Sequence, residues 1–290
     1  MPYGIDGIDH LVVAVRDLDK AREAYSKLGF TPTVRGEHGE LKTANHTMMF
    51  AAGDYLELRA VDEPTPANAH WSEFLAQREG LAAVVLKAGD ARAAQQALMA
   101  DGLAGSDLVD FGRPVVLPNG VHEARFTVAH LTPEATPGGR MYVCQHHTED
   151  LVWRPEYKVH ENGATGLAAI LIAADDPEAA AAPYARLFGA HAEPRGTVRV
   201  VQTGNVSIVV APPKALTYLW ADDPVLSVPR PCFAGFVVRV ADYYAAQQAL
   251  QKSKIPIIGS EGVLRVSSRH THGAGVAFAE SFDLARVMPG

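Results

Sequence analysis

His10 and Glu57 are the two residues whose types and positions best suit chemistry. His10 lies in an apolar stretch over residues 7–15, and Glu57 lies in another over residues 55–60. Side chains alternate between the two faces of a strand, so the large aliphatic residues of each stretch share the face opposite His10 or Glu57. If helices cover the aliphatic faces, both polar side chains point into the interior. An imidazole and a carboxylate that converge there suit a borderline divalent metal ion.

Both residues also have a structural interpretation. His10 would then be a hydrogen-bonded histidine at the start of a strand, and Glu57 would pair with Arg59 or another nearby arginine. In the chemical interpretation Glu57 can share the role of general base, which makes it the predicted catalytic residue.

Two other sites have related chemistry. His270 and His272 would face one way on a strand and form a rival metal site with Glu280, but Gly273 indicates a loop instead. Arg125, if it faces inward, could hold a substrate carboxylate through its planar fork. If it faces outward, it is an exposed strand residue.

The elements that position these residues recur four times along the chain. Each copy opens with an apolar strand, and a helix follows two or three residues later. The copies begin near Gly7, Gly80, Gly166 and Cys232, at intervals of roughly 65–85 residues. Short extended segments follow the first helix, at about residues 33–36, 47–50 and 55–60. The pattern predicts an α+β fold of four βαβββ modules. The alternative is an ordinary α+β protein whose strand–helix pairs look alike by chance.

A polar stretch over residues 148–165 separates the second copy from the third. It contains Pro155, Asn162 and Gly163, which favour turns and linkers. We therefore predict a first domain over residues 1–150 and a second, more degenerate domain over residues 151–290.

The sequence resembles the vicinal oxygen chelate superfamily, and within it the glyoxalase-like domain proteins (the glyoxalase, bleomycin resistance and extradiol dioxygenase fold). The resemblance rests on four groups of residues in the first half: Ile8-Asp9-His10-Leu11-Val12, Leu28-Gly29-Phe30, Thr43-Ala44-Asn45 ahead of Tyr55-Leu56-Glu57-Leu58, and Cys144-Gln145-His146 ahead of Trp153-Arg154-Pro155-Glu156. It implies a glyoxalase-like fold in which modules pair into open, curved, barrel-like sheets. It also implies a divalent metal held by the first and last strands of the modules.

The resemblance leaves the ligand set incomplete. Many relatives place a histidine where this chain has Ala83, so the third ligand must come from the cluster Gln145-His146-His147. If the apolar residues Met141 and Val143 pack outward, the alternation of strand faces points His146 inward. Counting strand positions from Gly139 instead favours the opposite face, which carries Gln145 and His147. We take His146 as the third ligand, beside His10 and Glu57, and His147 as a substrate contact.

Two more substrate contacts follow from the resemblance. His38 and Asn45 correspond to the loop at the mouth of the family's cavity, although both also suit an ordinary surface loop. Tyr55 shares the strand face of Glu57, so in a metal-free binding protein it would line the cavity and bind an aromatic ligand by stacking.

Composition limits the class of protein. The chain has 290 residues, 48% of them hydrophobic, and 26 basic against 33 acidic residues give a net charge of −7. These values are typical of a globular protein and argue against a nucleic-acid partner, which needs a basic face. Two cysteines, no apparent signal peptide and no long apolar run predict a cytoplasmic protein with no membrane segment.

Two functional hypotheses remain. The first is a metalloenzyme that binds a small oxygenated substrate through zinc, iron, manganese or nickel, with isomerase, lyase or dioxygenase chemistry. The second is a metal-free protein that binds or sequesters a small molecule, which the absence of a histidine at Ala83 favours. The degenerate second half is expected to close the barrel or to form the surface of a homodimer.

Overall fold

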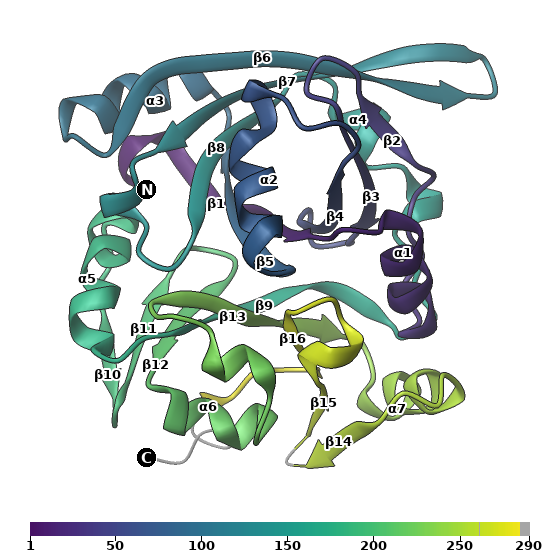
Figure 1. Ribbon diagram of the computed structural model, residues 1–290, viewed down its shortest axis with the longest axis vertical. Helices are drawn as coiled ribbons and strands as arrows, with labels where there is room; N and C mark the ends of the chain where they lie inside the picture. Colours follow the sequence, from purple (N-terminus) through teal and green to yellow (C-terminus); the bar gives the residue numbers. More distant parts are fainter. Residues whose placement is uncertain (261, 285–290) are drawn as a thin grey trace.

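The computed structural model describes residues 1–260 and 262–284, and its elements repeat the βαβββ order four times (Figure 1). The first module comprises β1 (Ile5–Ala14), α1 (Leu18–Lys27), β2 (Gly36–His38), β3 (Thr43–Met49) and β4 (Tyr55–Val61). After α2 (Ala69–Gln77), the second comprises β5 (Gly80–Ala88), α3 (Ala91–Ala100), β6 (Ala104–Leu117), β7 (Gly120–Leu131) and β8 (Arg140–His146).

The other two modules follow the short helix α4 (Glu149–Val152). The third comprises β9 (Ala164–Ala173), α5 (Pro177–Phe188), β10 (Glu193–Arg195), β11 (Val198–Gln202) and β12 (Ser207–Ala211). After α6 (Pro213–Trp220), the fourth comprises β13 (Cys232–Val240), α7 (Tyr243–Lys252), β14 (Ile257–Ser260), β15 (Val263–Val266) and β16 (Gly275–Ala279).

Modules pair into two eight-stranded mixed sheets. The first has the order β2-β3-β4-β1-β5-β8-β7-β6, and the second has the order β10-β11-β12-β9-β13-β16-β15-β14. In each, the first strands of the two modules pair antiparallel at the centre, and each first strand pairs parallel with its own module's last strand. The predicted α+β fold of paired βαβββ modules is therefore confirmed.

Local sequence explains where the helices begin. The Asp17 side chain accepts a hydrogen bond from the backbone N–H of Lys20 at 3.0 Å, and Asp176 does the same for Ala179 at 3.0 Å. Each aspartate satisfies one of the free N–H groups at its helix start. Gly29 follows α1 with a φ of +83°, a conformation that costs glycine little.

One apolar core joins the aliphatic faces of both sheets to the helices. It includes Tyr25 of α1, Leu98 of α3, Tyr184 of α5 and Leu250 of α7, all buried. Backbone hydrogen bonds also cross between the sheets, for example from Ala52 N to Thr165 O at 2.9 Å. The two sheets therefore share one core. The predicted division into two domains at residue 150 stays a prediction.

The two sheets differ at their other faces. In the second sheet, α6 covers this face, and the Trp220 ring lies against Gly235 and Gly275, which pair across β13 and β16. A Cβ atom at Gly275 would come within 2.6 Å of the Trp220 ring, so only glycine fits there. The first sheet instead carries polar side chains on the corresponding face, together with an aromatic lining.

The rival metal site does not form. His270 ends a short 3-10 helix and His272 lies in the turn after it, as Gly273 indicated, so the two do not share a strand face. The Glu280 side chain accepts a hydrogen bond from the backbone N–H of Tyr243 at 2.7 Å. In the described part of the chain, no helix is long and apolar enough to cross a bilayer.

Candidate metal centre

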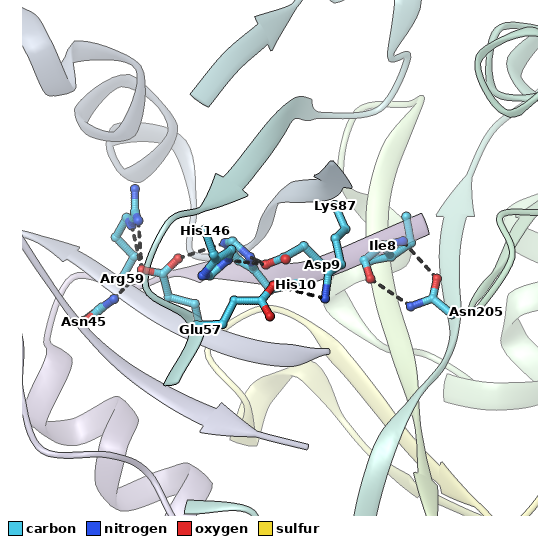
Figure 2. A network of polar contacts seen from close by, with 10 residues as sticks. Ile8, Asp9, His10, Asn45, Glu57, Arg59, Lys87, His146 and Asn205 are labelled. Carbon is cyan, nitrogen blue, oxygen red and sulfur yellow. Dashed lines mark hydrogen bonds and ion pairs between the residues drawn. The ribbon is translucent and has the colours of Figure 1, made fainter. Parts of the chain in front are cut away.

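Asp9, His10 and His146 form a buried cluster inside the first sheet (Figure 2). Asp9 Oδ1 lies 2.6 Å from His10 Nδ1 and 3.1 Å from His146 Nε2, so one carboxylate oxygen contacts both rings. Each residue offers one ligand atom, and these three atoms lie within 4.8 Å of one another. Of the two neighbouring histidines, His146 lies in this cluster, and its role as a metal ligand stays a prediction.

Glu57 lies on the other side of the His10 ring, between that ring and Arg59 (Figure 2). Its Oε2 is 3.5 Å from His10 Nε2. Its Oε1 accepts hydrogen bonds from Arg59 Nε at 3.0 Å, Arg59 Nη2 at 2.9 Å and Asn45 Nδ2 at 2.7 Å. The predicted pairing of Glu57 with Arg59 is therefore present through Oε1, while Oε2 faces His10, and the chemical role of Glu57 stays a prediction.

A bulge in β1 allows the consecutive residues Asp9 and His10 to reach the same cluster. The β1–β5 register shifts between Ile8 and His10, which breaks the strict alternation of faces. Asn205, from the second half of the chain, holds this bulge: its Oδ1 accepts from Ile8 N at 2.9 Å and its Nδ2 donates to Ile8 O at 2.8 Å (Figure 2). Gly7 leaves room for Asn205, since a Cβ atom there would lie 2.5 Å from Asn205 Oδ1.

The charges of the cluster stabilise one another against burial. Burial acts to raise the pKa of Asp9, but the His146 charge and the hydrogen bond from His10 hold that pKa well below its usual value. Burial also acts to raise the pKa of Glu57, and the Arg59 charge with the His10 contact lowers it instead. Burial favours neutral His10, whereas its contacts with Asp9 and Glu57 raise its pKa. Both carboxylates are therefore ionised near neutral pH, as metal ligands must be.

The unsatisfied atoms of the cluster test whether a metal ion fits. Within the described residues, Asp9 Oδ2, Glu57 Oε2 and His146 Nδ1 are buried without a hydrogen-bond partner. Buried polar atoms are usually paired, so three buried polar atoms without a hydrogen bond around two histidines call for an explanation. One carboxylate and two imidazoles are a common donor set for borderline divalent ions. The residues present therefore fit a divalent metal.

A cavity of about 30 Å³ adjoins the cluster, enough for about one or two water molecules. Four predicted site residues line it together with His10: His38, Asn45, Tyr55 and Glu57. The Tyr55 ring stacks on the His10 ring at a centroid distance of 4.1 Å. Burial lowers the pKa of His38 to about 3, so its ring is neutral, and its Nδ1 contacts Thr43 Oγ1 at 3.1 Å.

The remaining predicted contacts lie elsewhere. Arg125 and His147 line a surface depression on the outer side of the β6–β7 hairpin, away from the cavity. His147 Nε2 contacts Thr127 Oγ1 at 2.7 Å. Asn45 was expected in a loop, but β3 begins at Thr43, so pairing with β2 and β4 fixes Asn45 within the sheet.

Sequence reasoning missed three residues of the site. Asp9 was quoted only as part of a motif, and the alternation of faces assigned it to the wrong side. Arg59 was weighed only as a partner for Glu57, and it lines the cavity. Arg113 of β6 lines it as well, and no sequence signal distinguished it from the other arginines.

The two modules of the first sheet contribute unequally. His10 is opposite Tyr55 in the β1–β4 register, and Glu57 lies two residues beyond Tyr55. In the β5–β8 register Ala83 is opposite Arg140, and Tyr142 lies two residues beyond. The positions that correspond to His10 and Glu57 therefore hold no metal ligand in the second module, and His146, four residues after Tyr142, lies nearer the end of β8.

A family model described as a glyoxalase-like domain matches residues 8–188. A search of curated proteins found no significant match.

Solved structures share the fold at low sequence identity. A hypothetical protein from Staphylococcus aureus has a TM-score of 0.64 at 10% identity, covering 93% of this chain and 98% of its own. A mutant 4-hydroxymandelate synthase from Streptomyces coelicolor has a TM-score of 0.63 at 12% identity, covering 99% and 97%. A Mn(II)-bound glyoxalase from Novosphingobium aromaticivorans has a TM-score of 0.57 at 13% identity, covering 96% and 83%. The chain belongs to the glyoxalase-like domain family, within the vicinal oxygen chelate superfamily.

Proposed function

We propose that this chain is a metal-dependent enzyme that acts on a small oxygenated organic molecule. The observation that carries the proposal is the buried cluster of Asp9, His10 and His146, with Glu57 Oε2, which makes no hydrogen bond, facing His10. In a family whose solved relatives include a Mn(II)-bound glyoxalase, this cluster is where a metal would be sought first.

Each residue of the cluster has a distinct proposed role. His10 and His146 would hold the ion through imidazole nitrogen, and Asp9 would either bind it directly or orient both rings through its Oδ1. Where Asp9 orients the rings and His10 binds through Nε2, Glu57 Oε2 would complete the ligand set, since it lies 3.5 Å from His10 Nε2. A divalent ion held here would supply Lewis-acid polarisation of a carbonyl or enolate oxygen.

The catalytic role predicted for Glu57 is in tension with its surroundings. Arg59 and Asn45 both donate to Oε1 and keep the carboxylate ionised. An acid whose pKa is far below the working pH is a weak general base, so metal binding suits Glu57 better than proton abstraction. His38 is neutral and borders the same cavity, where it would hydrogen-bond to a substrate oxygen.

A metal-free binding protein is the second candidate. Ala83 and Tyr142 occupy the positions where a second pair of ligands would stand, and aromatic rings line much of the cavity. In this alternative the ion pairs of His10 with Asp9 and Glu57 would be purely structural, and the affinity for a ligand would come from stacking.

Metal titration distinguishes the two candidates. Chelator-treated full-length protein would be titrated calorimetrically with Mn²⁺, Zn²⁺, Fe²⁺ and Ni²⁺, and we expect one site per chain for at least one ion. His10→Ala and His146→Ala should abolish that site, whereas His147→Ala should retain it because His147 lies on the outer face. At a free-metal concentration of 100 times Kd, the ion should stabilise wild type by about 2.7 kcal/mol. If none of the four ions binds, or if His147→Ala behaves like His146→Ala, the proposal is wrong.

A further inference from the structure

Arg113 is a cation in the cavity that makes no hydrogen bond and no ion pair within the described residues, although the charge of Glu57 attracts it. It lines the same cavity as Glu57 and Arg59. Arg59 is paired, because it donates twice to Glu57 Oε1. Arg113, in contrast, has no hydrogen bond or ion pair with any residue in 1–260 or 262–284.

Arg113 is half-buried at the edge of the cavity. It lies on β6 opposite Ala124 of β7, close to the aromatic rings of Phe111 and Phe126. Burial lowers its pKa, yet a guanidinium keeps its charge at any physiological pH. The donors of this half-buried cation therefore remain free to bind an anion that enters the cavity.

The geometry around Gly36 keeps Arg113 aimed into the cavity. A Cβ atom at Gly36 would lie 2.5 Å from Asn45 Oδ1 and 3.1 Å from Arg113 Nη1. Because Gly36 has no side chain, the side chains of Asn45 and Arg113 can both lie beside the site. Gly36 belongs to β2 and Arg113 to β6, the two edge strands of the first sheet, so this contact lies at the seam where the sheet closes on itself.

A bound metal ion would give the site a surplus of positive charge. Asp9 and Glu57 bring two negative charges, and Arg59 and Arg113 bring two positive ones. A divalent ion would therefore leave the site positive, and an anionic ligand would bring it closer to neutral.

We propose that Arg113 binds a carboxylate group of the substrate and thereby selects small aromatic carboxylic acids. The proposal rests on the proposed function, because it assigns the substrate class of the same site. Arginine suits this role since its fork matches the two oxygens of a carboxylate. The aromatic rings of Tyr55, Phe111 and Phe126 would contact the body of the acid.

Space for such a ligand lies next to the cavity. A second cavity of about 70 Å³ shares four lining residues with the first: Arg59, Phe111, Val128 and Tyr142. The two volumes therefore adjoin at these side chains. Arg113 lies at the seam between β2 and β6 and would meet an entering anion before the buried cluster does.

The test compares acids with their neutral esters. Benzoate and phenylpyruvate, and the methyl esters of both, would be titrated calorimetrically into full-length protein with and without Mn²⁺. We expect the acids to bind wild type roughly ten- to a hundredfold more tightly than the esters. Arg113→Gln should remove this preference, and Arg113→Lys should retain part of it. Arg125→Gln, on the outer face, should leave it unchanged, and thermal melts would show that each variant is folded.

The outcomes separate this proposal from the metal proposal. If the acids and esters bind wild type equally, if no acid binds at millimolar concentration, or if Arg113→Gln keeps the preference, Arg113 does not select a carboxylate. If the preference depends on Arg113 but the protein binds no metal, the proposed substrate class is supported and the proposed metalloenzyme is wrong. If the protein binds a metal but shows no preference for acids, the metal proposal is supported and the proposed substrate class is wrong.

Discussion

Asp54 gives a prediction whose size follows directly from its surroundings. It precedes β4 and is buried, and both of its carboxylate oxygens accept from the backbone N–H of Leu167 in β9, at 3.1 and 3.3 Å. Burial raises its pKa from 3.8 to about 7, against the lowering effect of the Leu167 hydrogen bond. The carboxyl group therefore joins the two sheets at a point where its charged form is disfavoured.

The sign follows from proton linkage. The folded-state pKa lies above the unfolded value, so the native protein binds this proton more tightly than the unfolded chain does. Stability from this group is complete below pH 3.8 and is lost as the pH rises to about 7. At 1.36 kcal/mol per pKa unit, the total loss is about 4 kcal/mol.

Asp54→Asn removes the titration and keeps an oxygen that can accept from Leu167. The free energy of unfolding would be measured by urea denaturation of wild type and variant from pH 5 to pH 8.5. We expect the variant to gain stability relative to wild type as the pH rises, with most of the gain reached by pH 8. A difference between the two proteins that does not change with pH, or one that shrinks as the pH rises, would refute the reasoning.

Two further predictions concern the second half of the chain. Trp220→Ala should lower the free energy of unfolding by roughly 3–5 kcal/mol, because it removes the ring that packs against Gly235 and Gly275. Urea denaturation would measure this loss, and calorimetry should show an unchanged metal affinity. Asn205→Ala should lower the free energy of unfolding by roughly 1–3 kcal/mol, because two hydrogen bonds to Ile8 are lost. It should also weaken metal binding, because these hydrogen bonds hold the β1 bulge. Unchanged metal affinity in a folded Asn205→Ala variant would mean that the bulge forms without Asn205.

Local patterns were enough to predict most of the fold. Alternation along β1 and β4 correctly separated Leu11 and Leu56 from His10 and Glu57, since the pleat of a strand is a local property. The same parity placed His146 inside. The four-fold repeat predicted the modules because every copy carries its own apolar strand followed by a helix.

The rest of the site depends on contacts between distant parts of the chain. Asp9 joins the cluster only because the β1 bulge breaks the alternation, and the support for that bulge comes from Asn205, 197 residues beyond Ile8. Arg113 and Arg125 lie on neighbouring strands of one hairpin, and only the β6–β7 register decides which of them faces inward. The cytoplasmic location, the homodimer and the reaction type remain predictions.

X-ray absorption at the metal edge tests the central claim most directly. Wild type loaded with the ion that binds best should show only nitrogen and oxygen neighbours, with outer-shell scattering from two imidazole rings. His146→Ala should reduce that scattering to one ring, and His147→Ala should leave both. A spectrum without imidazole scattering, or one unchanged in His146→Ala, would contradict a metal centre built on His10 and His146.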